Sequence, residues 1–309
     1  MPTCDLGQGA TLNYVVHGPE DGPAVLLFNG AFSNLGMWSE TIPILVEAGV
    51  RCIAHDCRGV GESTPTPKDV AGSEQFTFDQ YADDAAALLD ILGIESAISW
   101  GVAWGSRPAV VFGIRHPTRC VGVVMQDMSV GVSAGEGWRL AQTMGGVMAA
   151  DKMKRLGIVE PVLPSFTEHA NRKLTAMAMH ATSKPPYDAP DSFLKELDKL
   201  SVANVLVATG EFDPNLVADP GGSYDVVARL QARLPHAELI ILENTGHGSV
   251  AQRPTLCARS KLSEQLPLLT NRFLLLAWLI VCRICSVPRL GATVWAVVIA
   301  KGKDIVAFS

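Results

Sequence analysis

The stretch AISWGVAWGS at residues 97–106 carries the strongest signal of the fold. Ala97–Ala103 is an apolar run typical of a buried strand, and helical spacing follows over about Trp104–Arg115. Gly101 and Gly105 stand on either side of the change, and glycine allows a strand and a helix to approach closely across a strained turn. The stretch therefore predicts a strand, a tight turn and a helix in succession.

Short apolar runs alternate with helical patterns on both sides of this stretch. Ala24–Asn29 is almost continuously apolar, which is typical of a strand buried on both faces. Strands alternating with helices indicate βαβ units, so the sequence predicts an α/β protein with a mostly parallel sheet flanked by helices. Further strands are predicted at Thr11–His17, Cys52–His55, Val121–Met125, Val205–Thr209 and Leu239–Leu242, and further helices at Phe76–Leu92 and Tyr224–Leu234.

The segment of about 130–200 interrupts this alternation. It is rich in Met, Ala, Lys and Glu, contains the pair Pro185-Pro186, and has helical rather than strand spacing. Because substrate sites of open sheets lie at the carboxyl ends of the strands, we interpret the segment as a helical lid over that edge. The alternative is a set of packing helices without a gating role.

The composition excludes several classes of protein. Of the 309 residues, 48% are apolar and 18% are charged, which suffices for a buried core and is too apolar for a disordered chain. Lys and Arg number 25 against 31 Asp and Glu, a formal net charge of −6, which argues against nucleic-acid binding. The seven cysteines have no framework spacing and the first residues lack the features of a secretory signal, so a reducing compartment is expected.

Polar or glycine-rich motifs follow the predicted strands. Gly101-Val102-Ala103-Trp104-Gly105 lies where a nucleophile elbow, Gly-x-Ser-x-Gly, is found at the junction of a strand and a helix, but alanine occupies the central position. Asn29-Gly30-Ala31-Phe32 follows a buried strand, where a loop amide can point at a developing oxyanion beside the amide of Trp104.

Two more candidates follow late strands. Asp213 comes just after the strand predicted at Val205–Thr209, and His247 just after the one predicted at Leu239–Leu242. An acid and then a histidine is the order expected after an elbow. Taken alone, Asp213 could cap a turn and His247 could be an ordinary loop histidine, but together after successive strands they predict a functional pair.

At this point the sequence resembles the α/β-hydrolase fold family, over roughly residues 10–257. Asp-x-Arg-Gly-x-Gly-x-Ser at residues 56–63 is the most specific local signature. Within the family, the sequence is most similar to 3-oxoadipate enol-lactonase-like proteins and related hydrolases of small esters or thioesters. A weaker resemblance is to abhydrolase proteins of fungal toxin and secondary-metabolite clusters.

The resemblance implies a role for each candidate residue. Asp213 would orient His247, and His247 would act as general base and then as general acid. The amides of Ala31 and Trp104 would form the oxyanion hole. The sequence departs from the family at Ala103, where the family carries its serine, so no acyl-enzyme can form there by the serine route.

Three functions remain open at this point. The leading interpretation is a hydrolase-type protein that acts on an acyl ester, thioester or lactone in a biosynthetic or catabolic pathway, either inactivated at position 103 or a natural variant in which His247 and Asp213 activate water. The alternatives are a cofactor-free lyase or isomerase in which the same pair abstracts a substrate proton, and a ligand-binding pseudo-hydrolase. A small acyl compound is the expected partner in each case. No cofactor and no metal are expected, because no dinucleotide fingerprint follows the first strand and no histidine pair has metal-ligand spacing.

The composition changes after the tripeptide Ser260-Lys261-Leu262, which has the form of a peroxisomal C-terminal signal. Two largely apolar runs follow, and neither reaches the roughly 20 residues of a bilayer span. We interpret residues 1–262 as the hydrolase domain and residues 263–309 as an atypical extension from read-through or mis-splicing. An ancestral chain that ended at Leu262 would be peroxisomal, and otherwise the chain is expected in the cytoplasm.

Overall fold

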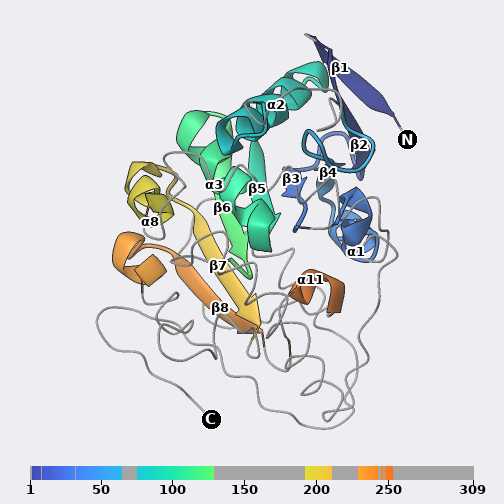
Figure 1. The fold of residues 1–309 in the computed structure, drawn as a ribbon. Coiled ribbons are helices and arrows are strands. Elements are labelled where there is room, and N and C mark those ends of the chain that lie inside the picture. Colours follow the sequence, from blue (N-terminus) through green and yellow to red (C-terminus); the bar gives the residue numbers. More distant parts are fainter. Residues whose placement is uncertain are drawn as a thin grey trace, which may run out of the picture.

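A computed structural model describes residues 2–7, 9–31, 33–64, 75–128, 192–210, 229–242, 245 and 248–252. Within them, eight strands form one sheet in the order β1-β2-β4-β3-β5-β6-β7-β8 (Figure 1). β1 pairs antiparallel with β2 and β2 with β4, and the other neighbours are parallel. The strands are β1 (Thr3–Gly7), β2 (Ala10–His17), β3 (Ala24–Phe28), β4 (Arg51–His55), β5 (Ala97–Val102), β6 (Cys120–Gln126), β7 (Val205–Gly210) and β8 (Glu238–Leu242).

Helices cover both faces of the sheet. In the described ranges they are η1 (Leu35–Trp38), α1 (Thr41–Glu47), α2 (Phe78–Ile91), η2 (Ala103–Gly105), α3 (Ser106–Arg115), α8 (Ser192–Glu196), η5 (Leu197–Lys199) and α11 (Ser249–Gln252), with 3₁₀ helices marked η. Residues 229–233 are also helical.

The alternation of side chains along β3 shows why the sheet needs a helical layer on each face. Leu26 and Phe28 belong to a core cluster with residues of α2 and α3, whereas Val25 and Leu27 belong to a second cluster with residues of η1 and α1. Successive side chains of a strand point to opposite faces, so an apolar strand such as this one must be covered on both sides. Figure 1 shows α2 and α3 on one side of the strands and α1 and α11 on the other.

The fold class predicted from the sequence is confirmed. The predicted strands match β2 to β8 to within one residue at every end, and α2 ends before Gly93, whose φ is +64°. The structure adds β1 and α1, which the apolar pattern did not predict. Most of the helix predicted at Tyr224–Leu234 lies outside the described residues.

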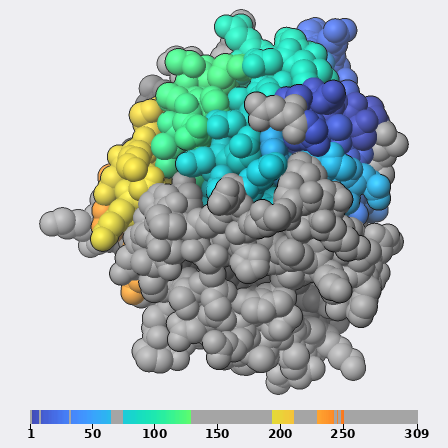
Figure 2. Space-filling model, turned by 45° about the horizontal axis from the view of Figure 1, so that its top comes forward, coloured from blue at the N-terminus to red at the C-terminus, as the bar shows by residue number. Residues whose placement is uncertain are grey.

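Two other interpretations also concern residues that the structure does not describe. Of the segment interpreted as a lid, only residues 192–200 are described; they lie beside the green residues that end near position 128 (Figure 2), and the guanidinium of Arg107 in α3 lies over the Phe193 ring of α8, 5.6 Å from its centroid. The proposed extension at 263–309 lies wholly outside the described residues. None of the helices in the described ranges has the length and apolar character that a bilayer crossing requires.

A buried ion pair ties the loop after β4 to α2. The guanidinium of Arg58 donates to both carboxylate oxygens of Asp84, with Nε–Oδ2 at 2.6 Å and Nη2–Oδ1 at 2.7 Å. Gln80 donates to Asp84 Oδ1 at 3.0 Å, and the Asp84 side chain is only 4% exposed. The arginine of the Asp-x-Arg-Gly motif therefore has a structural role.

Replacing Asp84 by asparagine tests this role. We expect Asp84→Asn to lower the free energy of unfolding in urea by about 3–5 kcal/mol, because the Arg58 charge stays buried without a counter-charge. Asp83→Asn is the matched control on the same helix, since its half-exposed ion pair with Arg115 is worth about 1 kcal/mol or less. Equal losses in the two variants would contradict the assignment.

Candidate active site

The turn between β5 and α3 has a strained backbone at its centre. Ala103 has a φ of +52°, in the left-handed region that residues with a side chain rarely occupy. A Cβ on Gly101 would lie 2.1 Å from the carbonyl oxygen of Gly105, and a Cβ on Gly105 would lie 2.3 Å from the carbonyl oxygen of Asn29. Only glycine fits at either position, and the two contacts force the chain to turn sharply at residue 103.

The loop after β3 lies directly beside this turn. A Cβ on Gly30 would come within 3.9 Å of the Cβ of Ala103 and within 3.4 Å of the carbonyl oxygen of Val102. Ala31 follows Gly30, and Trp104 follows Ala103. The first amides of a helix have no carbonyl partner within it, so the N–H of Trp104, near the start of η2, is available to an external acceptor. The structure thus brings together the three described members of the predicted site.

Asn29 fixes the start of the loop after β3. Its amide nitrogen donates to the carbonyl of His55 at 3.0 Å and to Asp56 Oδ1 at 3.1 Å, and its oxygen accepts from Trp38 Nε1 at 3.0 Å. The amide of Gly30 donates to the sulfur of Met37 at 3.1 Å. These contacts hold the loop rigidly beside Ala103, which suits a loop that must present an amide at a fixed place.

Asp56 is the hub of these contacts. Besides Asn29, its carboxylate accepts from the amide of Leu35 at 2.7 Å and from Asn13 Nδ2 at 2.8 Å. Burial raises the pKa of Asp56 to about 6, and the hydrogen bonds oppose that rise. Gly61 has a φ of +55°, and a Cβ there would lie 2.1 Å from Asp56 Oδ2. The motif at 56–63 therefore builds a support for the loop that carries Ala31.

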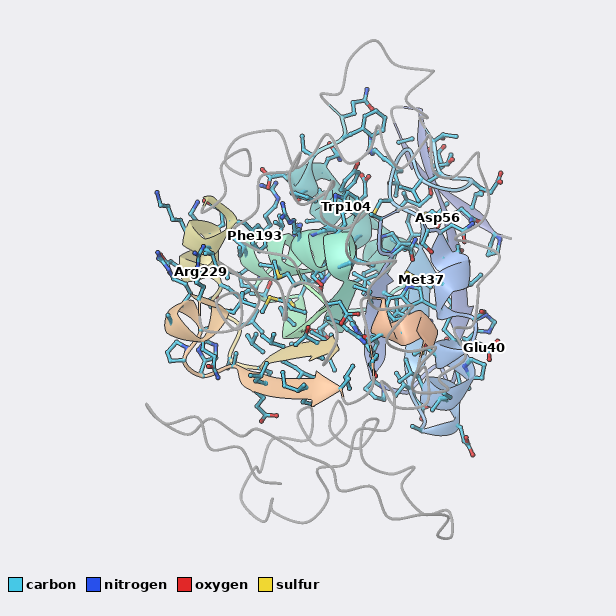
Figure 3. All side chains as sticks on the ribbon, turned by 60° about the horizontal axis from the view of Figure 1, so that its bottom comes forward. Met37, Glu40, Asp56, Trp104, Phe193 and Arg229 are labelled. Atoms are coloured by element: carbon cyan, nitrogen blue, oxygen red, sulfur yellow. The ribbon has the colours of Figure 1, made fainter. Side chains whose placement is uncertain are left out.

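Trp104 closes the other side of the turn. Its indole packs against Phe78 and Tyr81 of α2, with ring centroids 5.6 Å apart in both pairs. Figure 3 shows Trp104 at the turn after β5, Asp56 after β4, and Met37, from η1, beside α11; β3 separates β4 from β5 in the sheet. The turn and the residues that support it thus come from the ends of β3, β4 and β5 and from α2.

A second polar network lies at the ends of β6 and β7. Asp127, directly after β6, is fully buried, and its Oδ2 accepts from the amide of Ser249 at 2.7 Å and from the Ser249 hydroxyl at 2.6 Å. Its Oδ1 accepts from the amide of Gly210 at 3.2 Å. Neither Asp127 nor Ser249 is predicted from the sequence. The available signal is the polar pair Gln126-Asp127, directly after the strand predicted at Val121–Met125.

The two remaining predicted site residues, Asp213 and His247, lie outside the described residues, so their roles stay predictions. The described residues stop at Gly210, before Asp213, and resume at Gly248, directly after His247. The nearby serines are engaged elsewhere, since the Ser99 hydroxyl donates to the carbonyl of Ala109 and the Ser106 hydroxyl to the carbonyl of Gly101. No cluster of potential metal ligands occurs in the part of the chain that the structure describes.

His55 is a buried neutral group next to the hub. Its ring lies edge-on to Phe28 at 4.8 Å, and neither ring nitrogen has a hydrogen-bond partner among the described residues. Burial lowers the pKa of His55 to about 4. The unfolded chain, with an ordinary pKa near 6.5 for histidine, therefore binds a proton in a pH range where the folded chain does not.

Replacing His55 by leucine tests this burial. Because His55 is neutral in the folded chain, it does not lower the free energy of unfolding above pH 6.5. As the pH falls from 6.5 towards about 4, protonation of His55 in the unfolded chain lowers that free energy by about 3 kcal/mol. The raised pKa of Asp56 is common to both proteins. The difference in free energy of unfolding between the wild-type chain and His55→Leu therefore isolates the effect of the histidine. On acidification we expect the free energy of unfolding, measured in urea, to fall less for His55→Leu than for the wild-type chain. A difference independent of pH would contradict the burial.

Replacing Ala103 by glycine tests the strain at the turn. We expect Ala103→Gly to raise the free energy of unfolding by about 1 kcal/mol, because glycine occupies the left-handed region without the steric cost of a Cβ. Ala109→Gly in α3 is the control, with an expected loss of about 1 kcal/mol. A loss at position 103 as large as that at position 109 would show that the turn is unstrained.

Comparisons with known proteins agree with this geometry. A family model for the alpha/beta hydrolase fold matches residues 23–146. 3-oxoadipate enol-lactonase 1 of Acinetobacter baylyi is 30% identical over 131 residues, 42% of this chain and 46% of that protein. 3-oxoadipate enol-lactonase 2 of the same organism is 26% identical over 254 residues, 79% of this chain and 90% of that protein.

The matches to the first curated relatives span less than half of those proteins' own length. Among solved structures, the enol-lactonase from Burkholderia xenovorans LB400 superimposes with a TM-score of 0.62 at 24% identity, over 82% of this chain and 95% of that one. The sheet order, the glycine-flanked turn at residues 101–105 and these matches lead to the same conclusion. The chain has the α/β-hydrolase fold.

Proposed function

We propose that the chain is a hydrolase-type protein for a small acyl ester, thioester or lactone, with its nucleophile position occupied by Ala103. The observation that carries the proposal is the left-handed backbone of Ala103, φ +52°, held between two glycines that tolerate no Cβ. Such a strained turn persists only where its surroundings over-determine it, and strain of this kind clusters at active sites. A plain strand–helix connection needs none of it.

The proposed site stabilises negative charge on a carbonyl oxygen. The amides of Ala31 and Trp104 are its donors, and the contacts of Asn29 and Asp56 hold the first of them in place before a substrate arrives. Preorganised donors of this type are worth about 3–4 kcal/mol each in a transition state. In the proposal, His247 is the base and Asp213 orients its ring.

The missing element is an oxygen at position 103. With a hydroxyl there, the oxygen would attack the acyl carbon while His247 takes its proton, and the tetrahedral oxyanion would sit between the two amides. The proton would then pass to the leaving alcohol, thiol or enol oxygen as the acyl bond breaks. Water, activated by His247, would release the acid from the acyl-enzyme. With alanine the first of these steps cannot occur.

The relatives and the carbonyl-directed donors support the proposed substrate class. Two relatives are named as enol-lactonases, and a lactone is an internal ester whose carbonyl needs the same oxyanion donors. The weaker resemblance to fungal toxin and secondary-metabolite proteins supports a place for this chain in a biosynthetic pathway of that kind.

A second function is favoured by the same residue. The methyl group of Ala103 leaves the oxyanion donors and His247 without a nucleophile between them, which suits a lyase or isomerase that removes a proton and holds an enolate. A protein that only binds an acyl ligand is distinguished from both enzymes by His247→Ala, because that change abolishes turnover in an enzyme and leaves binding nearly intact in a binder.

Introducing serine at position 103 tests the proposal. We expect Ala103→Ser to raise kcat on a panel of aryl esters, enol lactones and acyl thioesters by at least about 10³-fold over the unchanged chain, because the nucleophile and its base act as a unit. Ala103→Gly is the matched control, since it changes the same turn and adds no oxygen. A second control, Ala103→Ser with His247→Ala, is expected to return to the background rate.

The results divide the candidate functions. A gain that depends on His247 establishes hydrolysis as the chemistry for which the site is built. A folded Ala103→Ser variant as inert as its parent on every ester, lactone and thioester contradicts the proposal and leaves proton transfer or ligand binding as the function.

A further inference from the structure

Asp127 combines two features that are costly in a folded protein. Its side chain is a fully buried carboxylate, and its φ is +51°, the only left-handed non-glycine backbone besides Ala103 among the described residues. A left-handed conformation costs about 1–2 kcal/mol for a residue with a side chain. Asp127 therefore needs strong local contacts to persist, and those contacts indicate what it does.

The contacts of Asp127 join the ends of two strands to the start of a helix. Oδ1 accepts the amide of Gly210, the last residue of β7, at 3.2 Å. Oδ2 accepts both the amide and the hydroxyl of Ser249, the first residue of α11, at 2.7 and 2.6 Å. Hydrogen bonds to an ionised carboxylate are about twice as strong as those between neutral groups. One side chain at the end of β6 thus binds the end of β7 and the segment after β8.

A chain of donors orients the Ser249 hydroxyl towards Asp127. Trp100 Nε1 donates to Gln126 Oε1 at 2.8 Å, and Gln126 Nε2 donates to the Ser249 hydroxyl at 2.6 Å. Because that hydroxyl oxygen already accepts from Gln126, its own hydrogen is directed to Asp127. α11 in turn contacts η1, next to the loop that carries Ala31. The network therefore connects the first residues of α11 to the surroundings of Ala103.

The two residues that Asp127 binds stand next to the proposed acid and base in the sequence. Asp213 comes three residues after Gly210, and His247 comes two residues before Ser249. A chain advances at most about 3.6 Å per residue, so covalent geometry alone keeps the Cα of His247 within about 7 Å of the Ser249 Cα and that of Asp213 within about 11 Å of the Gly210 Cα. Fixing Gly210 and Ser249 relative to each other limits the separation of the pair.

We propose that Asp127 is a positioning residue, whose carboxylate clamps the end of β7 to the start of α11 and so limits the separation of Asp213 and His247. This inference rests on the proposed function for the roles of those two residues. The clamp itself rests only on the contacts of Asp127, so it can be tested even if the chemistry is different. Asp127 touches no reacting atom in this account.

The test compares three variants of the full chain. Asp127→Asn keeps the shape but offers one acceptor oxygen and an NH₂ group, which cannot accept from both Gly210 and Ser249. Ser249→Ala keeps the backbone hydrogen bond and removes the hydroxyl. Ser99→Ala is the control, because it removes another buried serine hydrogen bond, from the Ser99 hydroxyl to the carbonyl of Ala109, outside the clamp.

Two measurements are made on each variant. Amide hydrogen exchange followed by NMR compares Gly210 and Ser249 with the amides of β5. Turnover is measured with Ala103→Ser as the common background, with kcat and KM determined separately.

We expect Asp127→Asn to speed exchange at Gly210 and Ser249 by about tenfold or more beyond any change in β5, because a charge-assisted hydrogen bond is lost at each place. We expect kcat to fall by about 10–100-fold with KM within about twofold, the cost of a misplaced catalytic group. Ser249→Ala is expected to change exchange and kcat in the same directions by smaller factors. Ser99→Ala is expected to lower the exchange protection of the sheet amides evenly and to leave kcat unchanged.

The outcomes separate this inference from the proposed function. If Asp127→Asn speeds exchange only at Gly210 and Ser249 while Ala103→Ser shows no turnover, the clamp is supported and only the proposed hydrolase function is contradicted. Exchange that rises evenly over the sheet, or a kcat no lower than that of Ser99→Ala, overturns the clamp. If Asp127→Asn does not fold, Ser249→Ala gives the same test, with the same two results for and against.

Discussion

The backbone of Gly105 touches the end of β3 so closely that a single added carbon would lie 2.3 Å from the carbonyl oxygen of Asn29 and 2.6 Å from that of Phe28. This contact draws the start of α3 against the neighbouring strand and leaves residue 103 at the apex of the turn in a left-handed conformation. The same contact places the loop after β3 beside the turn, with Gly30 facing Ala103. A side chain at either glycine would separate these parts.

Buried carboxylates support the turn from two sides. On one side Asp56, through Asn29 and the amide of Leu35, holds the loop that carries Ala31. On the other side Asp127, through Gly210 and Ser249, holds together the ends of β7 and α11. Both accept several N–H or O–H donors, which offsets the cost of burying a charge. Each carboxylate connects the loops of different strands, so the carboxyl edge of the sheet is built around two polar hubs.

Much of the fold follows from local patterns in the sequence. An apolar run bounded by turn residues predicts a strand whatever its neighbours, and the βαβ alternation then predicts a parallel sheet. The glycines at 101 and 105 and the residues Ala31, Ala103 and Trp104 could be selected because they stand just after predicted strands. The structure places the loop of Gly30 and Ala31 beside the turn of Ala103 and Trp104, as parallel strand ends at one edge require.

Other features could not be predicted, because they depend on contacts between distant residues. Asp127 and Ser249 are 122 positions apart, and nothing in the sequence pairs them before the strands are placed in order. The partner of Arg58 is Asp84, which lies on α2, and nothing in the sequence of that helix distinguishes Asp84 from its other acidic residues. β1 was missed because its five residues, TCDLG, show too little alternation to predict a strand.

The most direct test of the account is covalent labelling by a fluorophosphonate, whose phosphorus is attacked by an activated serine hydroxyl with loss of fluoride. The labelling tests the proposal that the chain retains a hydrolase site that lacks only its nucleophile. We expect folded Ala103→Ser to gain one adduct, found by mass spectrometry on the peptide that contains residue 103, while the unchanged chain and Ala103→Ser with His247→Ala gain none. A folded Ala103→Ser variant that remains unlabelled, or one that is labelled elsewhere, would contradict the proposal.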